Sequence, residues 1–158
     1  MDRSRLSRFV NQRLNELPLR EPAVVSPVSS VREAVVAMQD GSTSCVLAME
    51  SGKLAGIFTE RDVLTRCMID DFDWDQPLSA AVLTPDPQTI AADRTIAEAM
   101  MSMQQHQVRT LPVVDSHDSV VGLVRLGDLL RHLAEEFAED VLNLPPRPHQ
   151  VMERREGG

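Results

Sequence analysis

Aromatic side chains are scarce in this sequence, and their scarcity narrows the functions open to it. The 158 residues include four Phe, one Trp and no Tyr. Proteins that bind single-stranded nucleic acid stack the bases on aromatic rings, which this chain can barely provide. The formal net charge of −8 also argues against the basic face that a general nucleic-acid binder needs. We therefore expect no nucleic-acid partner.

Cysteines and long apolar runs are equally sparse. Cys45 and Cys67 lie inside apolar patterns, which predicts small core residues rather than a disulfide framework or a zinc site. No apolar run approaches the length needed to span a bilayer, and no apolar segment of a signal peptide follows the charged first residues. We therefore expect a cytoplasmic protein with no membrane partner.

The familiar motifs of catalysis and metal binding are missing as well. The sequence has no P-loop, no G-x-G-x-x-G and no G-x-S-x-G. The acidic run at residues 70–75 lacks the glycine and glutamate of an EF-hand loop, and is interpreted as a solvated linker. The four histidines are scattered without ligand spacing. We expect neither an enzyme nor a catalytic cofactor nor a metal site.

What the sequence does contain is an internal repeat. Residues 30–34 recur as residues 95–99, an offset of 65, and after one inserted residue Asp62 matches Asp128. Such a repeat indicates one supersecondary unit that has been duplicated. Two similar halves also form clefts between them, where small ligands commonly bind.

Hydrophobic spacing predicts the order β-α-β-β-α in each copy. Ser30 and Thr95 are each followed three residues later by Glu, the capping box that begins a helix, and apolar residues then recur at helical spacing. These helices should end near Gly41 and His106. The strands are predicted from apolar runs at residues 24–25, 45–49, 54–58, 111–114 and 120–124.

Apolar stripes predict three further helices. The N-terminal helix, over residues 2–17, carries Leu6, Phe9, Val10, Leu14 and Leu17, and Pro18 and Pro22 end it. The second helix of the first copy carries Val63, Leu64, Cys67 and Met68. That of the second copy carries Leu129, Leu130, Leu133, Phe137 and Val141. The predicted fold class is therefore α/β (α+β).

Two sequence motifs carry a resemblance to a known family. They are Gly56-Ile-Phe-Thr59-Glu-Arg-Asp62 in the first copy and Val108-Arg109-Thr-Leu-Pro112-Val-Val-Asp115 in the second. Over roughly residues 22–138 the chain resembles the CBS-domain pair, or Bateman module. The resemblance implies tandem CBS repeats with pseudo-two-fold symmetry in a free-standing regulatory protein. We divide the chain into an N-terminal helix and linker (1–21), repeat 1 (22–76), repeat 2 (77–142) and a loose, Pro-rich tail (143–158).

Members of this family bind adenosine compounds, and the resemblance implies where. Asp62 would accept hydrogen bonds from the ribose diol, Thr59 would serve ribose or phosphate, and Arg109 would bind phosphate. The remaining members of this site are Ile57 against the base, Thr89, beside which backbone groups read the base edge, and Val108.

The same residues also have a simpler interpretation. Thr59-x-x-Asp62 fits a capping box at the start of the second helix. Both roles are compatible, because a helix N-terminus favours nearby anions. Arg109 taken alone would be a solvated arginine, but its place before Leu111 and Pro112 favours the functional role.

A second site of this kind would use Asp128, and it departs from the family pattern. Arg125 stands where Thr or Ser is expected, and Ser44 stands where Arg109 stands in the other copy. Arg125 could reach a phosphate or equally fill the pocket, so we expect this site to be weaker or empty. Its other members are Val24, Cys45 and Leu123.

We thus predict a regulatory module that binds AMP, ADP or ATP in the cleft between the repeats. Binding would shift the population of module or dimer arrangements that an unidentified protein target reads. The wide apolar stripes of the second helices predict a homodimer. The alternatives are a structural dimerisation module with degenerate pockets, and a binder of S-adenosylmethionine or a dinucleotide.

Overall fold

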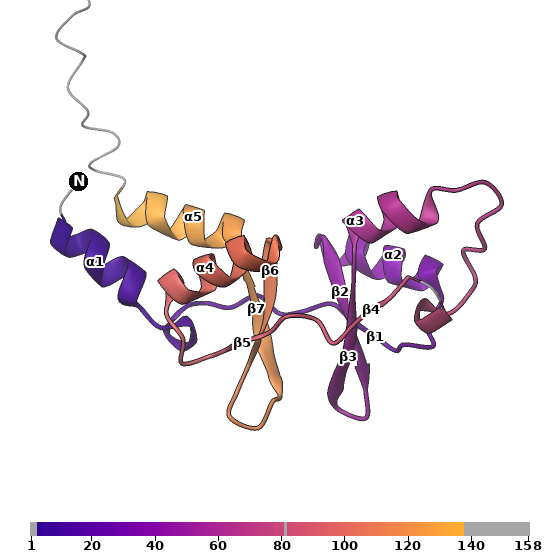
Figure 1. The fold of residues 1–158 in the computed structure, drawn as a ribbon, viewed down its shortest axis with the longest axis horizontal. Helices are drawn as coiled ribbons and strands as arrows, with labels where there is room; N and C mark the ends of the chain where they lie inside the picture. The colour runs from indigo at the N-terminus through magenta and orange to yellow at the C-terminus, as the bar shows by residue number, and fades with distance from the viewer. Residues whose placement is uncertain (1–2, 81, 138–158) are drawn as a thin grey trace, which may run out of the picture.

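Two β-sheets stand side by side at the centre of the molecule, and helices cover their outer faces (Figure 1). The computed structural model describes residues 3–80 and 82–137. Each half contains one sheet, and the two long hairpins lie next to each other at the middle of the long axis. Within the described part of the chain, no helix has the length and hydropathy needed to cross a bilayer.

Both copies have the predicted order of elements. The first contains β1 (Val24–Val25), α2 (Val31–Asp40), β2 (Cys45–Glu50), β3 (Lys53–Thr59) and α3 (Glu60–Asp62). The second contains β5 (Ile90–Ala91), α4 (Ile96–His106), β6 (Thr110–Val114), β7 (Val120–Arg125) and α5 (Leu126–Glu136). In each, the first strand pairs parallel to the second, and the second and third form an antiparallel hairpin. The predicted fold class is confirmed.

The capping boxes begin α2 and α4 as predicted. The Ser30 Oγ accepts a hydrogen bond from the Glu33 N–H at 3.2 Å, and the Glu33 carboxylate accepts from the Ser30 N–H at 2.8 Å. Thr95 and Glu98 repeat both bonds at the same distances. Each cap satisfies backbone donors that the helix leaves unpaired, a contribution of about 1 kcal/mol.

The N-terminal helix is shorter than its apolar stripe predicted. α1 spans Arg3–Asn11, and a 3-10 turn, η1, follows at Leu14–Glu16, so the prediction of one helix to residue 17 is wrong. The reason is a set of backbone bonds to the second copy. The Gln12 carbonyl accepts from the Ile96 N–H at 3.0 Å, and the Leu14 N–H donates to the Arg94 carbonyl at 2.9 Å. These bonds replace the helical ones.

The N-terminal segment completes the second copy, and the connector between the copies completes the first. Phe9 and Leu14 are buried in the core of the second copy. Leu78, in the 3-10 turn η3 (Leu78–Ala80), and Val82 are buried in the core of the first. In packing terms, residues 3–20 therefore belong with the second copy, and residues 72–85 with the first.

The second helix of the first copy also departs from prediction. After α3 the chain forms a π-helical turn, η2, at Val63–Cys67. The Thr65 hydroxyl donates to the Arg61 carbonyl at 2.8 Å and so competes for a helical acceptor. Cys67 is buried, but Leu64 and Met68 are 71% and 65% exposed. In α5, Leu129 is buried as its stripe predicted, and Phe137 is buried directly after the helix; Val141 lies outside the described residues.

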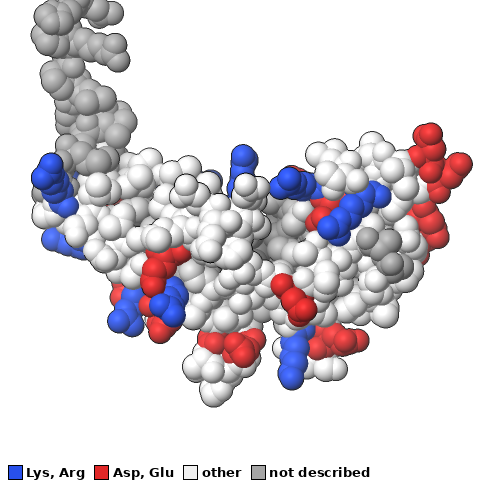
Figure 2. Space-filling model, viewed as in Figure 1, with Lys and Arg blue, Asp and Glu red and all other residues white. Residues whose placement is uncertain are grey.

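Acidic side chains gather at one end of the long axis (Figure 2). Acidic groups mark the loop that follows η2, where Asp70, Asp71, Asp73 and Asp75 are exposed, as expected of a solvated linker. Asp75 forms an ion pair with Arg32 at 2.8 Å. Among residues 3–80 and 82–137, no group of His, Cys, Asp and Glu side chains could hold a metal ion.

Two segments cross from one copy to the other, the N-terminal segment and the connector between the copies. Each of these linkers passes beside a glycine. β4 (Thr84–Pro85) pairs with β3 at Gly56, and Arg20 exchanges two backbone hydrogen bonds with Leu123, beside Gly122. A Cβ on Gly56 would lie 2.6 Å from the Leu83 Cγ, and one on Gly122 would lie 2.7 Å from the Leu19 Cβ. Both crossings therefore require glycine.

A small buried cluster joins the two sheets between the crossings. It consists of Cys45 and Leu47 of β2 and Leu123 of β7. Burial raises the pKa of the Cys45 thiol. Cys45 and Cys67 are both buried and free of disulfides, so the prediction of core cysteines is confirmed.

We predict that Gly56→Ala destabilises the fold by about 1–3 kcal/mol, because its Cβ would collide with Leu83 and the Thr84 carbonyl. Gly127→Ala is the matched control: a Cβ there meets nothing within 4 Å, and alanine favours the helix by up to about 1 kcal/mol. Urea unfolding followed by circular dichroism compares the two. Equal effects on the unfolding midpoint would contradict the role given to the glycine.

Candidate functional site

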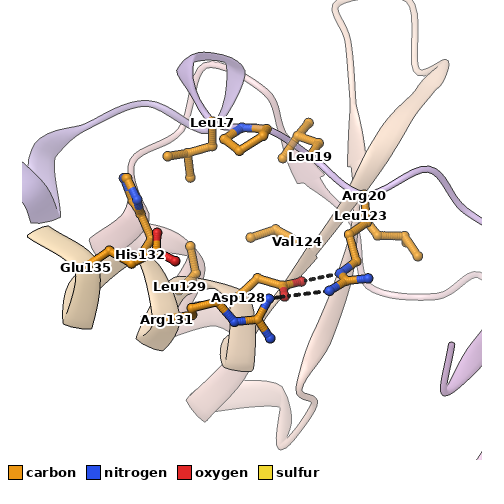
Figure 3. A pocket seen from close by; sticks show the side chains of 11 residues that line it. Leu17, Leu19, Arg20, Leu123, Val124, Asp128, Leu129, Arg131, His132 and Glu135 are labelled. Atoms are coloured by element: carbon orange, nitrogen blue, oxygen red, sulfur yellow. Dashed lines mark hydrogen bonds and ion pairs between the residues drawn. The ribbon is translucent and has the colours of Figure 1, made fainter. Parts of the chain in front are cut away.

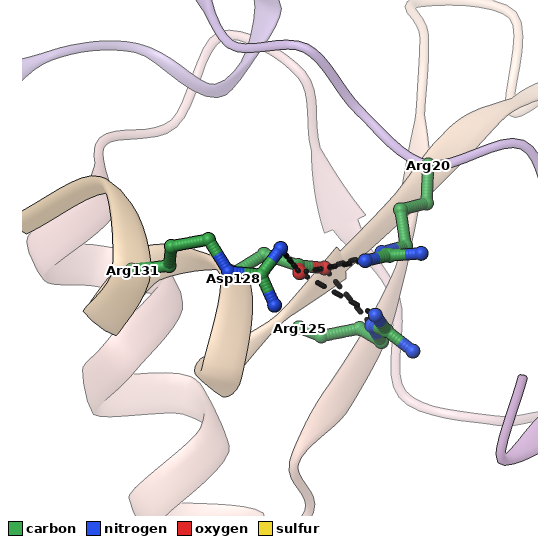
Figure 4. A network of polar contacts seen from close by, with 4 residues as sticks. All are labelled: Arg20, Arg125, Asp128 and Arg131. Atoms are coloured by element: carbon green, nitrogen blue, oxygen red, sulfur yellow. Dashed lines mark hydrogen bonds and ion pairs between the residues drawn. The ribbon is translucent and has the colours of Figure 1, made fainter. Parts of the chain in front are cut away.

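One carboxylate is surrounded by three arginines where β7 meets α5 (Figure 4). The Asp128 Oδ2 accepts hydrogen bonds from the Arg20 Nε at 2.8 Å and from the Arg125 Nε at 2.9 Å. The Arg131 Nη1 lies 3.7 Å from Oδ1. We call these four residues the Asp128 network. It carries a net positive charge within a chain whose formal net charge is −8.

The arginines hold Asp128 in its ionised form. The hydrogen bond from Arg125 is the largest influence on the carboxyl, and together with Arg20 it lowers the pKa of Asp128 from 3.8 to about 2, against the opposing effect of burial. The side chain remains 26% exposed. At neutral pH the site therefore presents a permanent carboxylate that acts only as a hydrogen-bond acceptor.

A cavity of about 300 Å³ opens beside this network, and we call it the Asp128 cavity. Leu17, Pro18 and Leu19 form one wall, and α5 forms the other (Figure 3). Leu123 and Val124 of β7 complete its apolar lining, whereas Arg20, Asp128 and Arg131 gather at one end and His132 and Glu135 lie at the other. The cavity thus offers an apolar slot between two polar ends, one of which carries the Asp128 network.

A larger hollow of about 620 Å³ lies between the copies, beside Arg125. Arg125 comes from the second copy and connects this hollow to the Asp128 network, because it also pairs with Asp128. The first copy supplies the rest of the lining: Val35, Met38, Gln39, Ser42, Thr43, Ser44, Glu60, Val63 and Leu64.

Three members of the first predicted site lie together where β3 ends. Thr59 and Asp62 form the capping box that the simpler interpretation predicted: the Asp62 Oδ2 accepts from the Thr59 hydroxyl at 2.7 Å and from its N–H at 2.9 Å. Ile57 lies two residues before Thr59 and packs at the contact between the copies. Arg66 lies 3.5 Å from the other Asp62 oxygen. The role of these residues in ligand binding stays a prediction.

The other three members of that site lie elsewhere. Val108 and Arg109 line a hollow of about 520 Å³ whose lining comes entirely from the second copy, including Met100 and Met103 of α4. Thr89 lines a separate hollow beside the turns of the two hairpins. The structure therefore distributes the six residues over three places.

The second predicted site is the better assembled one. Ser44 shares a hollow with Arg125, Arg125 pairs with Asp128, and Cys45 packs against Leu123. Val24 lies one strand away, on β1, and is 53% exposed.

Sequence reasoning missed two residues of this network. Arg131 had a detectable signal, because it follows Asp128 by three positions on a predicted helix. Arg20 had none, because 108 positions separate it from Asp128.

The protein-family model that matches this chain is the CBS domain, at residues 14–68 and 79–135. The chain belongs to the CBS domain family. The two matches correspond to the two halves of the internal repeat, and the resemblance seen in the sequence is confirmed.

Two curated relatives show how this CBS pair occurs in other proteins. The CBS domain-containing protein YhcV of Bacillus subtilis is 32% identical over 121 residues, which cover 76% of this chain and 85% of that protein. The meiotically up-regulated gene 70 protein of Schizosaccharomyces pombe is also 32% identical, over 76% of this chain, but the match spans only 16% of its length.

Solved structures share the fold at lower identity. An uncharacterised conserved protein from Pyrococcus horikoshii superposes with a TM-score of 0.71 at 21% identity, over 78% of this chain and 93% of that one. A CBS domain protein from Pyrobaculum aerophilum, complexed with AMP, gives 0.69 at 22% identity, over 78% and 99%. These likenesses establish the architecture of the chain.

Asp128→Asn should destabilise the fold at neutral pH and reduce its acid sensitivity. Because the folded-state pKa of about 2 lies below the ordinary 3.8, ionised Asp128 stabilises the fold above pH 3.8, and this contribution is lost as the pH falls towards 2. The advantage of the wild type over the variant should therefore shrink through that window, as measured by urea midpoints across the pH range.

Asp75→Asn is the control for this experiment. Asp75 is 73% exposed, and Arg32 is its partner in the ion pair, so its loss should change the midpoint less. A stability difference between wild type and Asp128→Asn that stays constant with pH would contradict the assignment.

Proposed function

We propose that this chain is a non-enzymatic regulatory module of the cytoplasm that binds an adenine nucleotide at the Asp128 network. The observation that carries the proposal is the combination of a permanent carboxylate, an excess of arginines and an adjoining apolar slot. A nucleotide offers a ribose diol, an anionic phosphate and an apolar base, and each has a counterpart here.

Each part of a nucleotide can be matched by its chemistry to residues of this site. The Asp128 carboxylate accepts hydrogen bonds from both ribose hydroxyls. Arg125, with Arg131 near it, binds phosphate through charge-assisted hydrogen bonds. The base occupies the apolar part of the Asp128 cavity. The volumes of the two neighbouring spaces, about 300 and 620 Å³, lie within the range of ~300–1,000 Å³ that is usual for small-molecule sites.

The charge of the site favours a phosphorylated ligand over S-adenosylmethionine. Three arginines against one carboxylate attract an anion, whereas S-adenosylmethionine carries a cationic sulfonium. Two fold neighbours support the adenosine part of the proposal: the Pyrobaculum aerophilum protein is complexed with AMP, and the CBS pair of protein MJ0100 with 5′-methylthioadenosine and S-adenosylmethionine. We therefore favour AMP, ADP or ATP.

The geometry also leads us to favour the Asp128 site over the Asp62 site, the reverse of the ranking from the sequence. The Asp62 side chain is 12% exposed, against 26% for Asp128, and one arginine lies beside it, Arg66, where three surround Asp128. Ligand binding would act by population shift, in which the occupied module favours one arrangement that a protein target reads.

Calorimetric titration with AMP, ATP and adenosine tests the proposed phosphate contact. Arg125→Ala should weaken AMP and ATP binding about tenfold or more, the contribution of a charge-assisted hydrogen bond, and should change adenosine binding little. Arg94→Ala is the matched control, since Arg94 also pairs with a carboxylate of its own helix turn, Glu98, at 3.0 Å but lies outside the network. An equal loss for all three ligands would remove Arg125 from the phosphate contact, and no binding by the wild type would overturn the proposed function.

We also propose that the module is a homodimer formed through its helical face. Leu64, Met68, Ile69 and Leu130 are exposed there by 71%, 65%, 63% and 49%, and burial against a second copy would remove this apolar surface from water. This surface also favours the second candidate function, a dimerisation module whose pockets bind nothing.

Light scattering coupled to gel filtration measures the assembly. The wild type should elute at twice the chain mass of 17.6 kDa, and the double variant Leu64→Glu, Met68→Glu at the chain mass itself. Val121→Glu, an exposed apolar position on the β7 hairpin, is the control that should remain dimeric. A wild-type particle of single chain mass at micromolar concentration would contradict the dimer.

A further inference from the structure

The Asp128 cavity is closed on one side by the segment that leads into the first copy. We call residues 12–20 the N-terminal strap. Its Leu17, Pro18 and Leu19 face α5 across the cavity (Figure 3). A ligand in this cavity would therefore touch the strap directly.

The strap is attached to the second copy at its two ends. At the first end, the Leu14 and Asn15 N–H groups donate to the Arg94 and Ala92 carbonyls, both at 2.9 Å. At the second end, the Arg20 backbone exchanges two hydrogen bonds with Leu123, at 3.1 and 2.8 Å. The Arg20 side chain adds a bidentate ion pair with Asp128 at this second end.

The first copy has an equivalent connection, but there the arginine follows the carboxylate in the chain, whereas in the second copy the arginine belongs to the linker. There Arg66 lies 3.5 Å from Asp62 and donates to the Val82 carbonyl at 2.9 Å. Val82 precedes β4, the linker strand that crosses the first copy. In both copies, therefore, an arginine connects the carboxylate of the predicted site to the linker that crosses that copy.

The Asp128 carboxylate has no capacity left for a ribose diol. Arg20 and Arg125 each donate to both of its oxygens, and Arg131 lies near Oδ1. A diol must displace Arg20 or Arg125, whose hydrogen bonds fill both oxygens. Of the two arginines that hydrogen-bond both oxygens, Arg20 is released more easily, because its side chain is 41% exposed and water can solvate it after release, whereas that of Arg125 is 20% exposed.

We propose that the Arg20–Asp128 ion pair is a latch. The ribose diol of the nucleotide replaces Arg20 as the hydrogen-bond partner of Asp128, and the N-terminal strap is thereby loosened. This inference rests on the proposed function and adds the route by which binding reaches the rest of the chain. The structural consequence of binding is that the strap and α1 are held less firmly on the second copy. Since coupling is reciprocal, a change that opens the latch must also tighten binding.

Titration of AMP into Arg20→Ala tests that reciprocity. The variant should bind AMP about two- to fivefold more tightly than the wild type, the factor that corresponds to one exposed ion pair. Arg32→Ala is the matched control, because Arg32 makes the same bidentate contact with Asp75, at 2.8 and 3.4 Å, outside the network. Its AMP affinity should equal that of the wild type.

Hydrogen exchange measures the strap itself. Saturating AMP should speed the exchange of the Arg20 and Leu123 amides in the wild type, and should leave the Ile57 amide, at the equivalent crossing in the first copy, unchanged. In Arg20→Ala these two amides should exchange faster already, with no further effect of AMP.

Three results would overturn the latch while leaving the proposed function in place: weaker AMP binding by Arg20→Ala, unaltered binding, or slower strap exchange in the wild type with AMP. Absence of nucleotide binding by both wild type and variant would overturn the proposed function and the latch together.

Discussion

The close approach of two backbones beside a glycine is the constraint on which this structure depends. At Gly56 and Gly122, each linker lies so near the third strand of a copy that a Cβ would come within 2.6 and 2.7 Å of it. The first crossing lets the connector complete the first copy, and the second lets the N-terminal segment complete the other. The two copies are thereby interlocked through their linkers as well as through the cluster around Leu123.

The crossing at Gly122 also builds the candidate site. Backbone pairing with Leu123 fixes Arg20, and from there its guanidinium reaches Asp128. The same pairing places Leu17 and Leu19 opposite α5, so that an apolar slot forms beside the charged network. The backbone crossing at Gly122 thus positions both the charged side chain of Arg20 and the wall of the cavity. A ligand bound there would therefore contact the N-terminal segment directly.

Most of the fold could be predicted from the sequence, because its signals are local. The capping boxes at Ser30 and Thr95, the apolar runs of the strands and the internal repeat all act over a few residues or a constant offset. The end of α1 could not be predicted, since bonds from Gln12 and Leu14 to the second copy decide it. The π-helical turn after Asp62 likewise replaced a regular pattern through the Thr65 side chain. In the candidate site, Arg125 and Asp128 were visible as a departure from a motif, whereas Arg20 became visible only in three dimensions.

The central claim is that an adenine nucleotide binds at Asp128, between the strap and α5. The most direct measurement is a titration of the ¹⁵N-labelled protein with AMP, followed by amide chemical shifts. The account predicts that the largest changes cluster at residues 17–20 and 123–132, with smaller ones at Ser44 and Cys45. Changes centred on Thr59 and Asp62 instead, or no changes with AMP, ADP or ATP, would contradict it.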